Sequence, residues 1–261
     1  MRELSKKSGL TKLTIKKNFT KLKLPNKCHH PRPIHALLDC TFFGDKSREQ
    51  WGLLVIRDAI FKENLWWKFI EQESLSDYKE GYHDLIELGY VFVSVTCDGF
   101  RGLTSIFNNC PVQFCHFHQK QIIRRYVTKN PKLIAGIELK ELVEMLGEIP
   151  SDEFKKYLQA YLFHHKEFLA EKTVDPMTKK WHFTHQRLRS AIRSLLTNFN
   201  HLFTYEKNLD LQIPTTNNAL ESHFSHIKTL TRIHRGLKRK MKQKFVETIL
   251  LNSSIVKKKS Y

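Results

Sequence analysis

Apolar and polar residues follow strand-like patterns through the first half of the chain. Residues 34–43 (IHALLDCTFF), 51–60 (WGLLVIRDAI) and 63–73 (ENLWWKFIEQE) are rich in Leu, β-branched and aromatic residues. Residues 90–95 (YVFVSV) form an almost continuous apolar run, which is typical of a buried central strand. These patterns predict four strands that belong to one sheet.

Helical segments separate the later strands. Residues 77–88 predict a helix that stops at Gly89, and a short helix over 100–109 precedes a strand over 111–115. A basic helix over 116–129 follows. An order of strands followed by alternating helices and strands predicts a mixed α/β sheet flanked by helices.

The pattern changes to helical spacing from about residue 132 to residue 205, where strand signals nearly vanish. We predict an all-helical insertion there. A connector and a helix over 211–230 follow, and a last helix over 239–251 completes the globule. The predicted organisation is therefore a core that is interrupted by the insertion before its final helices.

Two short basic helices are predicted before the first strand. Residues 2–8 and 11–22 have helical character, and Gly9 lies in the turn between them, as in a helix-turn-helix. The second helix would direct Lys12, Lys16 and Lys17 toward DNA. The alternative is a basic terminal appendage that reads no DNA.

The charge balance indicates a polyanionic partner. The chain has 44 Lys and Arg against 26 Asp and Glu, a formal net charge of +18. No apolar run approaches the roughly 20 residues that span a bilayer, so DNA is favoured over a membrane. Positive charge gathers in residues 1–27 and 228–244, and the alternative for each run is a solvated surface. The phosphate-contacting residues that we predict in the second run are Arg232, Arg235, Lys238, Arg239 and Lys240.

Three carboxylates are candidates for divalent-metal binding. Asp39 and Asp98 each follow an apolar run, and open α/β sheets place ligands at strand ends. The alternative is that each Asp only opens a turn. Glu221 lies at a helix start, where with Asn218 as N-cap it would serve as the glutamate of a capping box. Both roles are compatible, and a third carboxylate suits a two-metal phosphoryl-transfer site.

A Cys-x-x-His pair, Cys115 and His118, follows the strand predicted over 111–115. Structural zinc requires four Cys or His ligands in paired spacings. The only close additional candidates are Cys110 and His116, and His116 is adjacent to Cys115. We therefore predict that this pair supports the fold near the carboxylates and binds no zinc. The five cysteines as a set are typical of reduced thiols in a cytosol.

Four blocks of sequence together resemble the DDE transposases of bacterial insertion sequences, in the Mutator-like group. They are LLDCTFFG (37–44), SVTCDGFRGL (94–103), QFCHFHQ (113–119) and PTTNNALESHFSHIK (214–228). The resemblance covers about residues 34–250. It implies a ribonuclease-H-like fold, Asp39, Asp98 and Glu221 as a catalytic metal-binding triad, and Cys115 and His118 as support. The DNA-binding region before the core is shorter than relatives usually have.

The resemblance implies a DNA transposase that cleaves and joins strands at the ends of a mobile element with Mg²⁺ or Mn²⁺. We expect DNA as partner, a homodimer or higher oligomer, no membrane, and a location in the bacterial cytoplasm at the nucleoid. The alternatives are an inactive transposase remnant that only binds DNA and a structure-specific nuclease on the same fold.

The predicted domain bounds follow from these observations. A partial helix-turn-helix covers residues 1–28, and the first part of the ribonuclease-H-like core covers 34–130. The helical insertion covers 131–210, and the final catalytic and basic helices cover 211–261.

Overall fold

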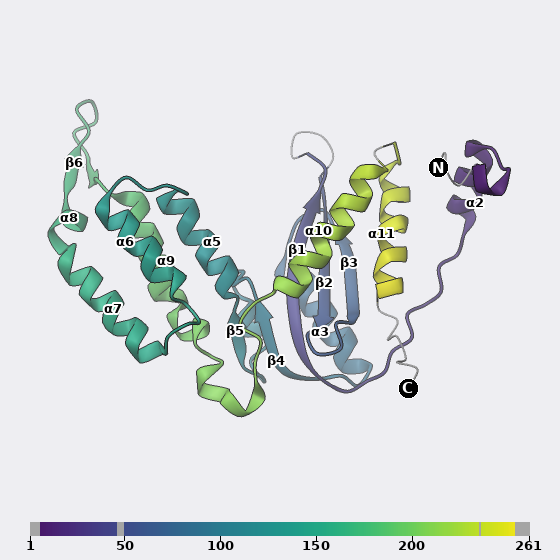
Figure 1. Ribbon diagram of the computed structural model, residues 1–261, viewed down its shortest axis with the longest axis horizontal. Helices are drawn as coiled ribbons and strands as arrows, with labels where there is room; N and C mark the ends of the chain where they lie inside the picture. The colour runs from purple at the N-terminus through teal and green to yellow at the C-terminus, as the bar shows by residue number, and fades with distance from the viewer. Residues whose placement is uncertain (1–5, 46–49, 235, 254–261) are drawn as a thin grey trace.

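A mixed five-stranded sheet forms the centre of the molecule (Figure 1). The computed structural model describes residues 6–45, 50–234 and 236–253. The strand order is β3-β2-β1-β4-β5, in which β1, β2 and β3 are antiparallel neighbours and β4 and β5 run parallel to β1. This order and these directions define a ribonuclease-H-like sheet. The strands are β1 (Pro33–Phe43), β2 (Trp51–Asp58), β3 (Asn64–Ile70), β4 (Val91–Cys97) and β5 (Val112–Phe114).

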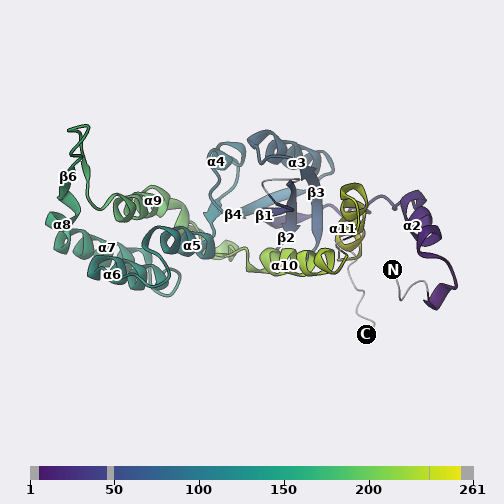
Figure 2. The same cartoon turned by 90° about the horizontal axis from the view of Figure 1, so that it is seen from above.

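Helices cover both faces of this sheet, as the view in Figure 2 makes plain. Helices α3 (Leu75–Glu87) and α4 (Leu103–Ile106) lie on one face. Helix α10 (Asn218–Ile233) lies on the other face with α11 (Arg239–Ser253), which packs beside β3. Because the sheet is covered on both sides, its central strands are largely buried on both faces and carry long apolar runs rather than a strict alternation.

The side chains of β1 divide between two apolar cores. Ile34, Ala36 and Leu38 join the core on the α3 side, whereas Leu37 joins the core beneath α10 and α11. This division follows from the two-residue period of a strand, which directs successive side chains to opposite faces. The second core is formed mainly by β2 residues and by Leu220, Phe224, Ile227, Val246 and Leu250 of α10 and α11.

A second, helical part of the molecule follows β5, and we call residues 134–202 the helical lobe (Figure 1). A short two-stranded hairpin interrupts its helices, which the apolar pattern did not predict. The hairpin strands are three residues each and largely exposed, so they have no apolar signature. Helix α5 (His116–Val127) leads from β5 toward the lobe. The elements of the lobe are α6 (Ile134–Glu144), α7 (Ser151–His164), α8 (Lys166–Ala170), β6 (Lys172–Val174), β7 (Trp181–Phe183) and α9 (Gln186–Leu202). A 3-10 helix, η1 (Glu206–Leu211), leads back to the sheet.

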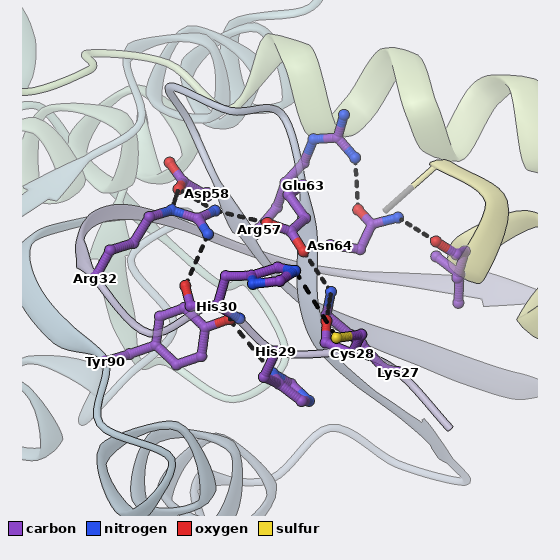
Figure 3. A network of polar contacts seen from close by, with 11 residues as sticks. Lys27, Cys28, His29, His30, Arg32, Arg57, Asp58, Glu63, Asn64 and Tyr90 are labelled. Carbon is purple, nitrogen blue, oxygen red and sulfur yellow. Dashed lines mark hydrogen bonds and ion pairs between the residues drawn. The ribbon is translucent and has the colours of Figure 1, made fainter. Parts of the chain in front are cut away.

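The segment that joins α2 (Lys12–Lys21) to β1 is fixed to the sheet by ion pairs (Figure 3). Lys27 and Arg32 bind the two carboxylate oxygens of the buried Glu63 at 2.5 and 2.6 Å, and Arg32 also binds Asp58 at 2.8 Å. Burial alone would raise the pKa of Glu63, but the two cations hold it below its ordinary value. The chain therefore enters the core in one defined position.

Smaller differences from the predicted elements concern helix limits. The helix predicted over 100–109 is reduced to α4, and the first of the two N-terminal helices falls partly on residues 1–5, outside the described part. The second is α2, which begins after the N-cap Thr11, and Gly9 before it has a φ of 65°.

No helix among the described residues combines the length and apolar character needed to cross a membrane. The domain bounds stay predictions.

Candidate active site

Asp39 and Asp98 lie at the same level on two adjacent parallel strands. The last pair between β1 and β4 joins Leu37 to Thr96, and each aspartate follows two residues later. Asp39 is not at the end of its strand, as the sequence suggested, because β1 continues to Phe43 in its pairing with β2. At this level β4 has ended at Cys97, whereas β1 continues past Asp39.

Backbone amides orient both carboxylates. The amide of Cys40 donates to Asp39 Oδ1 at 2.8 Å, and the amide of Phe100 donates to Asp98 Oδ1 at 3.0 Å. Gly99, between Asp98 and Phe100, has a φ of 83°, and a Cβ there would lie 3.2 Å from Phe114. A side chain at position 99 would therefore disturb the turn that holds Asp98.

Glu221 reaches the sheet from the first turn of α10. The N-cap of α10 is Asn217 and not Asn218, so the predicted capping box is wrong. The side chain of Asn217 instead donates to the carbonyl of Leu38 at 2.8 Å, directly before Asp39. This bond ties the start of α10 to β1 and so brings Glu221 beside Asp39.

Asp39, His118 and Glu221 line one small pocket of about 360 Å³. Burial, then the charge of Asp98, and to a smaller extent that of Glu221 raise the pKa of Asp39 well above its usual range. Burial also raises the pKa of Glu221. Asp98 does not line this pocket, but its charge acts on both Asp39 and His118. The three predicted carboxylates thus form one electrostatically coupled group.

The Cys115–His118 pair lies against Glu221. One ligand atom each of Cys115, His118 and Glu221 lie within 4.8 Å of one another, and His118 Nε2 is 3.4 Å from Glu221 Oε1. The buried thiol of Cys115 accepts the amide of Asn217 at 3.2 Å, and burial raises its pKa to about 11. The third group near the pair is therefore a carboxylate, which the sequence alone did not suggest.

The other zinc candidates near that pair point elsewhere. His116 Nε2 lies 2.6 Å from the carbonyl of Leu202, within the contact between α5 and α9. The thiol of Cys110 donates to the carbonyl of Phe107. Among the described residues, neither joins Cys115 and His118 in a cluster with metal-binding spacing.

A fourth carboxylate, Glu73, was missed by sequence reasoning. Its pKa is raised by burial and by the charge of Asp98, and it accepts a hydrogen bond from Tyr78. Its charge in turn acts on Asp39. Glu73 comes directly before Ser74, the N-cap of α3, so the only available signal was its place after a strand.

A basic pocket of about 830 Å³ borders the pocket lined by Asp39, His118 and Glu221, which we call the acidic pocket. Lys228 and Arg232, one turn apart on α10, line both pockets. The larger pocket also contains stacked Phe43 and Trp51, whose ring centroids lie 4.3 Å apart. Its remaining cationic lining comes from Lys238, Arg239 and Lys242.

The other predicted DNA-binding residues are dispersed or outside the described part. Lys240 is exposed on α11, and Lys17 is exposed on α2. Arg235 lies outside the described residues, as do the side chains of Lys12 and Lys16. Three of the predicted residues, Arg232, Lys238 and Arg239, are thus brought together around the basic pocket, and Arg239 also pairs with Glu71.

Comparison with solved structures finds distant similarity to chains of two complexes. A chain of the Drosophila P element transposase strand transfer complex is 13% identical, with 94% of this chain and 72% of that chain covered and a TM-score of 0.31. A chain of the simian T-cell lymphotropic virus intasome in complex with PP2A regulatory subunit B56 gamma is 11% identical, with 65% of this chain covered and a TM-score of 0.26. This chain spans about half (51%) of the length of that second chain. No curated protein matches.

Comparison with protein families gives a more specific result. The model of the transposase family IS66 matches residues 79–239, a segment that includes Asp98 and Glu221 and begins after Asp39. The sequence-based assignment to transposases is therefore confirmed, whereas the assignment to the Mutator-like group is wrong, since the matching family is a distinct one. The chain belongs to the IS66 family of transposases.

Proposed function

We propose that this chain catalyses metal-dependent DNA strand cleavage and strand transfer at the ends of a mobile element. Asp39, Asp98 and Glu221 hold the divalent cations, and the basic pocket holds the DNA strand. The observation that carries the proposal is the meeting of an acidic pocket and a basic pocket on α10, where Lys228 and Arg232 line both.

The carboxylate group has the properties of a Mg²⁺ or Mn²⁺ site. Burial and like charge both raise the pKa of Asp39, and a cation nearby would remove that penalty. Glu221 Oε1 is buried, and among the described residues it has no hydrogen-bond partner, only the ion-pair contact with His118 Nε2 at 3.4 Å. Oxygen ligands from a few carboxylates suit hard cations that also take phosphate oxygens and water. When bound, such ions supply activation of the attacking oxygen and stabilisation of the leaving oxygen.

The protein's own groups then have distinct tasks. Asp39 and Asp98, fixed by backbone amides, provide a rigid edge for the ions. Glu221 completes the site from α10, and His118 lies against it as a positioning residue. Lys228 and Arg232 bind backbone phosphates beside the carboxylates, which fixes the strand without reading its sequence.

Assembly on DNA follows from the proposed reaction. Two element ends must be brought together before they are joined, so we propose a homodimer or higher oligomer on DNA. The basic α2, whose exposed Lys17 faces solvent, is proposed as part of a DNA-binding region that precedes the core.

A cleavage and joining assay tests the function. Duplexes that contain the DNA flanking the gene are incubated with the protein and with Mg²⁺, Mn²⁺ or EDTA. Cleavage followed by joining to a second duplex, present only with the metal, supports a transposase. Cleavage without joining would indicate a nuclease on this fold. Binding without cleavage would indicate a DNA-binding remnant and would contradict the proposal.

A further inference from the structure

A second histidine–carboxylate cluster lies in the helical lobe, far along the chain from the three carboxylates of the core. Glu138 is on α6, His164 is the last residue of α7, and His165 follows it. One ligand atom from each lies within 4.8 Å of the other two. This spacing is close to that of ligands around one metal ion.

The chain geometry at the end of α7 makes this cluster possible. His165 leaves helical geometry, with φ −97° and ψ 16°, as α7 passes into α8. The rings of His164 and His165 therefore stay close, with centroids 4.7 Å apart and planes at 83°. In an uninterrupted helix, two consecutive side chains would diverge around the axis.

Two of the three groups, His165 and Glu138, already lie against each other. His165 is buried, its ring packs on Tyr161 at 4.8 Å, and its Nε2 lies 2.6 Å from Glu138 Oε2. His164 is exposed and can change rotamer at little cost. Tetrahedral coordination with bonds near 2.0 Å needs ligand atoms about 3.3 Å apart. An ion would therefore replace the hydrogen bond between His165 and Glu138, whose atoms move slightly apart, while His164 rotates toward them.

The donor set selects the class of ion. Two imidazole nitrogens and one carboxylate oxygen suit Zn²⁺ and similar divalent transition metals, whereas Mg²⁺ prefers oxygen ligands alone. Glu141, one turn after Glu138 on α6, lines the same concavity of about 460 Å³ as Glu138 and His164. A fourth ligand is thus available from Glu141 or from water.

We propose that Glu138, His164 and His165 bind one divalent ion of the zinc class. The ion joins α6 to the corner between α7 and α8 and stabilises the helical lobe. The proposal is independent of the activity of the core, because it concerns different residues and a different class of ion.

The test measures zinc binding by the full chain in excess Mg²⁺, which occupies hard oxygen sites. Zn²⁺ titration by calorimetry gives stoichiometry and affinity, and Co²⁺ substitution reports tetrahedral coordination through its visible absorption. The key variant is His164→Ala, because an exposed residue can be removed without disturbing the fold. The matched control is His182→Ala, an exposed histidine on β7 of the same lobe.

We expect the wild type to bind one more zinc ion than His164→Ala, or to bind that ion more than about tenfold more tightly. Zinc should also raise the thermal unfolding temperature of the wild type and of His182→Ala, but not that of His164→Ala. Glu138→Gln should behave as His164→Ala does.

Three results would overturn the proposal. Equal stoichiometry and affinity in the wild type and His164→Ala would show that the cluster holds no zinc. Loss of the ion in Cys115→Ser, with His164→Ala unchanged, would assign the zinc to the core cluster of Cys115, His118 and Glu221. An equal loss in His182→Ala and His164→Ala would show unspecific binding by surface histidines.

Discussion

Two clusters in this molecule place a histidine against a glutamate, and their surroundings differ. In the core, His118 lies 3.4 Å from Glu221, beside the buried Asp39 and a basic pocket. In the helical lobe, His165 lies 2.6 Å from Glu138, and the nearest additional ligand is the exposed His164. The two His–Glu pairs are alike. Further carboxylates surround the pair in the core, whereas a second imidazole lies beside the pair in the helical lobe.

The comparison indicates that a His–Glu contact alone does not define a chemistry. Several carboxylates around it favour hard cations with phosphate oxygens, whereas a second imidazole favours zinc. Cationic side chains beside the core cluster add a place for a polyanion. The core pair is thus proposed for phosphoryl transfer, and the lobe pair for stability.

The largest effect that separates the two clusters is expected at Asp98. Asp98→Asn removes a charge that acts on both Asp39 and His118, so cleavage should fall by about 10²–10³-fold or more. Zinc binding by the lobe should not change. Gel-based cleavage rates and a parallel binding assay measure this. The control is Asp210→Asn, an exposed aspartate after the helical lobe. Loss of DNA binding in Asp98→Asn would make Asp98 structural instead.

His118 should matter less than the carboxylates. His118→Ala leaves the ligands in place but removes the group that lies against Glu221, so cleavage should fall about 10–100-fold. The Mg²⁺ concentration for half-maximal activity should rise, a change that a purely structural residue would not cause. His226→Ala, an exposed histidine on α10, is the control. An unchanged Mg²⁺ requirement would argue against a positioning role.

Cys115 is expected to contribute mainly to stability. Cys115→Ser places a hydroxyl in a buried site where the thiol accepts the amide of Asn217. The free energy of unfolding, measured by chemical denaturation, should decrease by about 1–3 kcal/mol. Activity should fall in part because Asn217 also holds the start of α10. Cys28→Ser, at an exposed cysteine, serves as the control. Unchanged stability together with lost zinc would reassign Cys115 as a metal ligand.

The smallest expected effect concerns the cationic side chains that line the basic pocket beside the core cluster. Arg232→Glu and Lys238→Glu should each reduce the slope of log affinity against log salt by about one, because each neutralises one phosphate in the wild type. Lys156→Glu, an exposed residue on α7, should change it less. Fluorescence anisotropy over a range of salt concentrations measures the slopes. Equal slopes for all three variants would remove the basic pocket from the proposed strand path.

Much of the sheet and the three candidate carboxylates could be named from the sequence because their signals are local. The apolar run before Asp98 predicted a buried strand, and the structure has β4 there. The extent of β1 beyond Asp39 was not predictable in the same way, since it depends on pairing with β2. Strand existence is a property of a short segment, whereas the end of a strand depends on its neighbours.

The contacts that complete the site were beyond sequence reasoning. His118 and Glu221 are separated by about one hundred residues, and no local pattern reports that they meet. Asn217 and Asn218 are equally good N-caps by residue type, and the choice is made by the carbonyl of Leu38 on β1. The β6–β7 hairpin was missed because its short exposed strands bury no alternating face.

The bonds of Asn217 have a consequence for the order of folding. Its side chain binds a residue 179 positions earlier, and its amide binds one 102 positions earlier. Closing such long loops is slow, because chain entropy is lost before the contacts form. The sheet can therefore pair before α10 docks onto it. The proposed metal-binding carboxylates would then be among the last parts of the molecule to mature, and a metal-sensitive probe at Glu221 would report completion of the native state rather than its beginning.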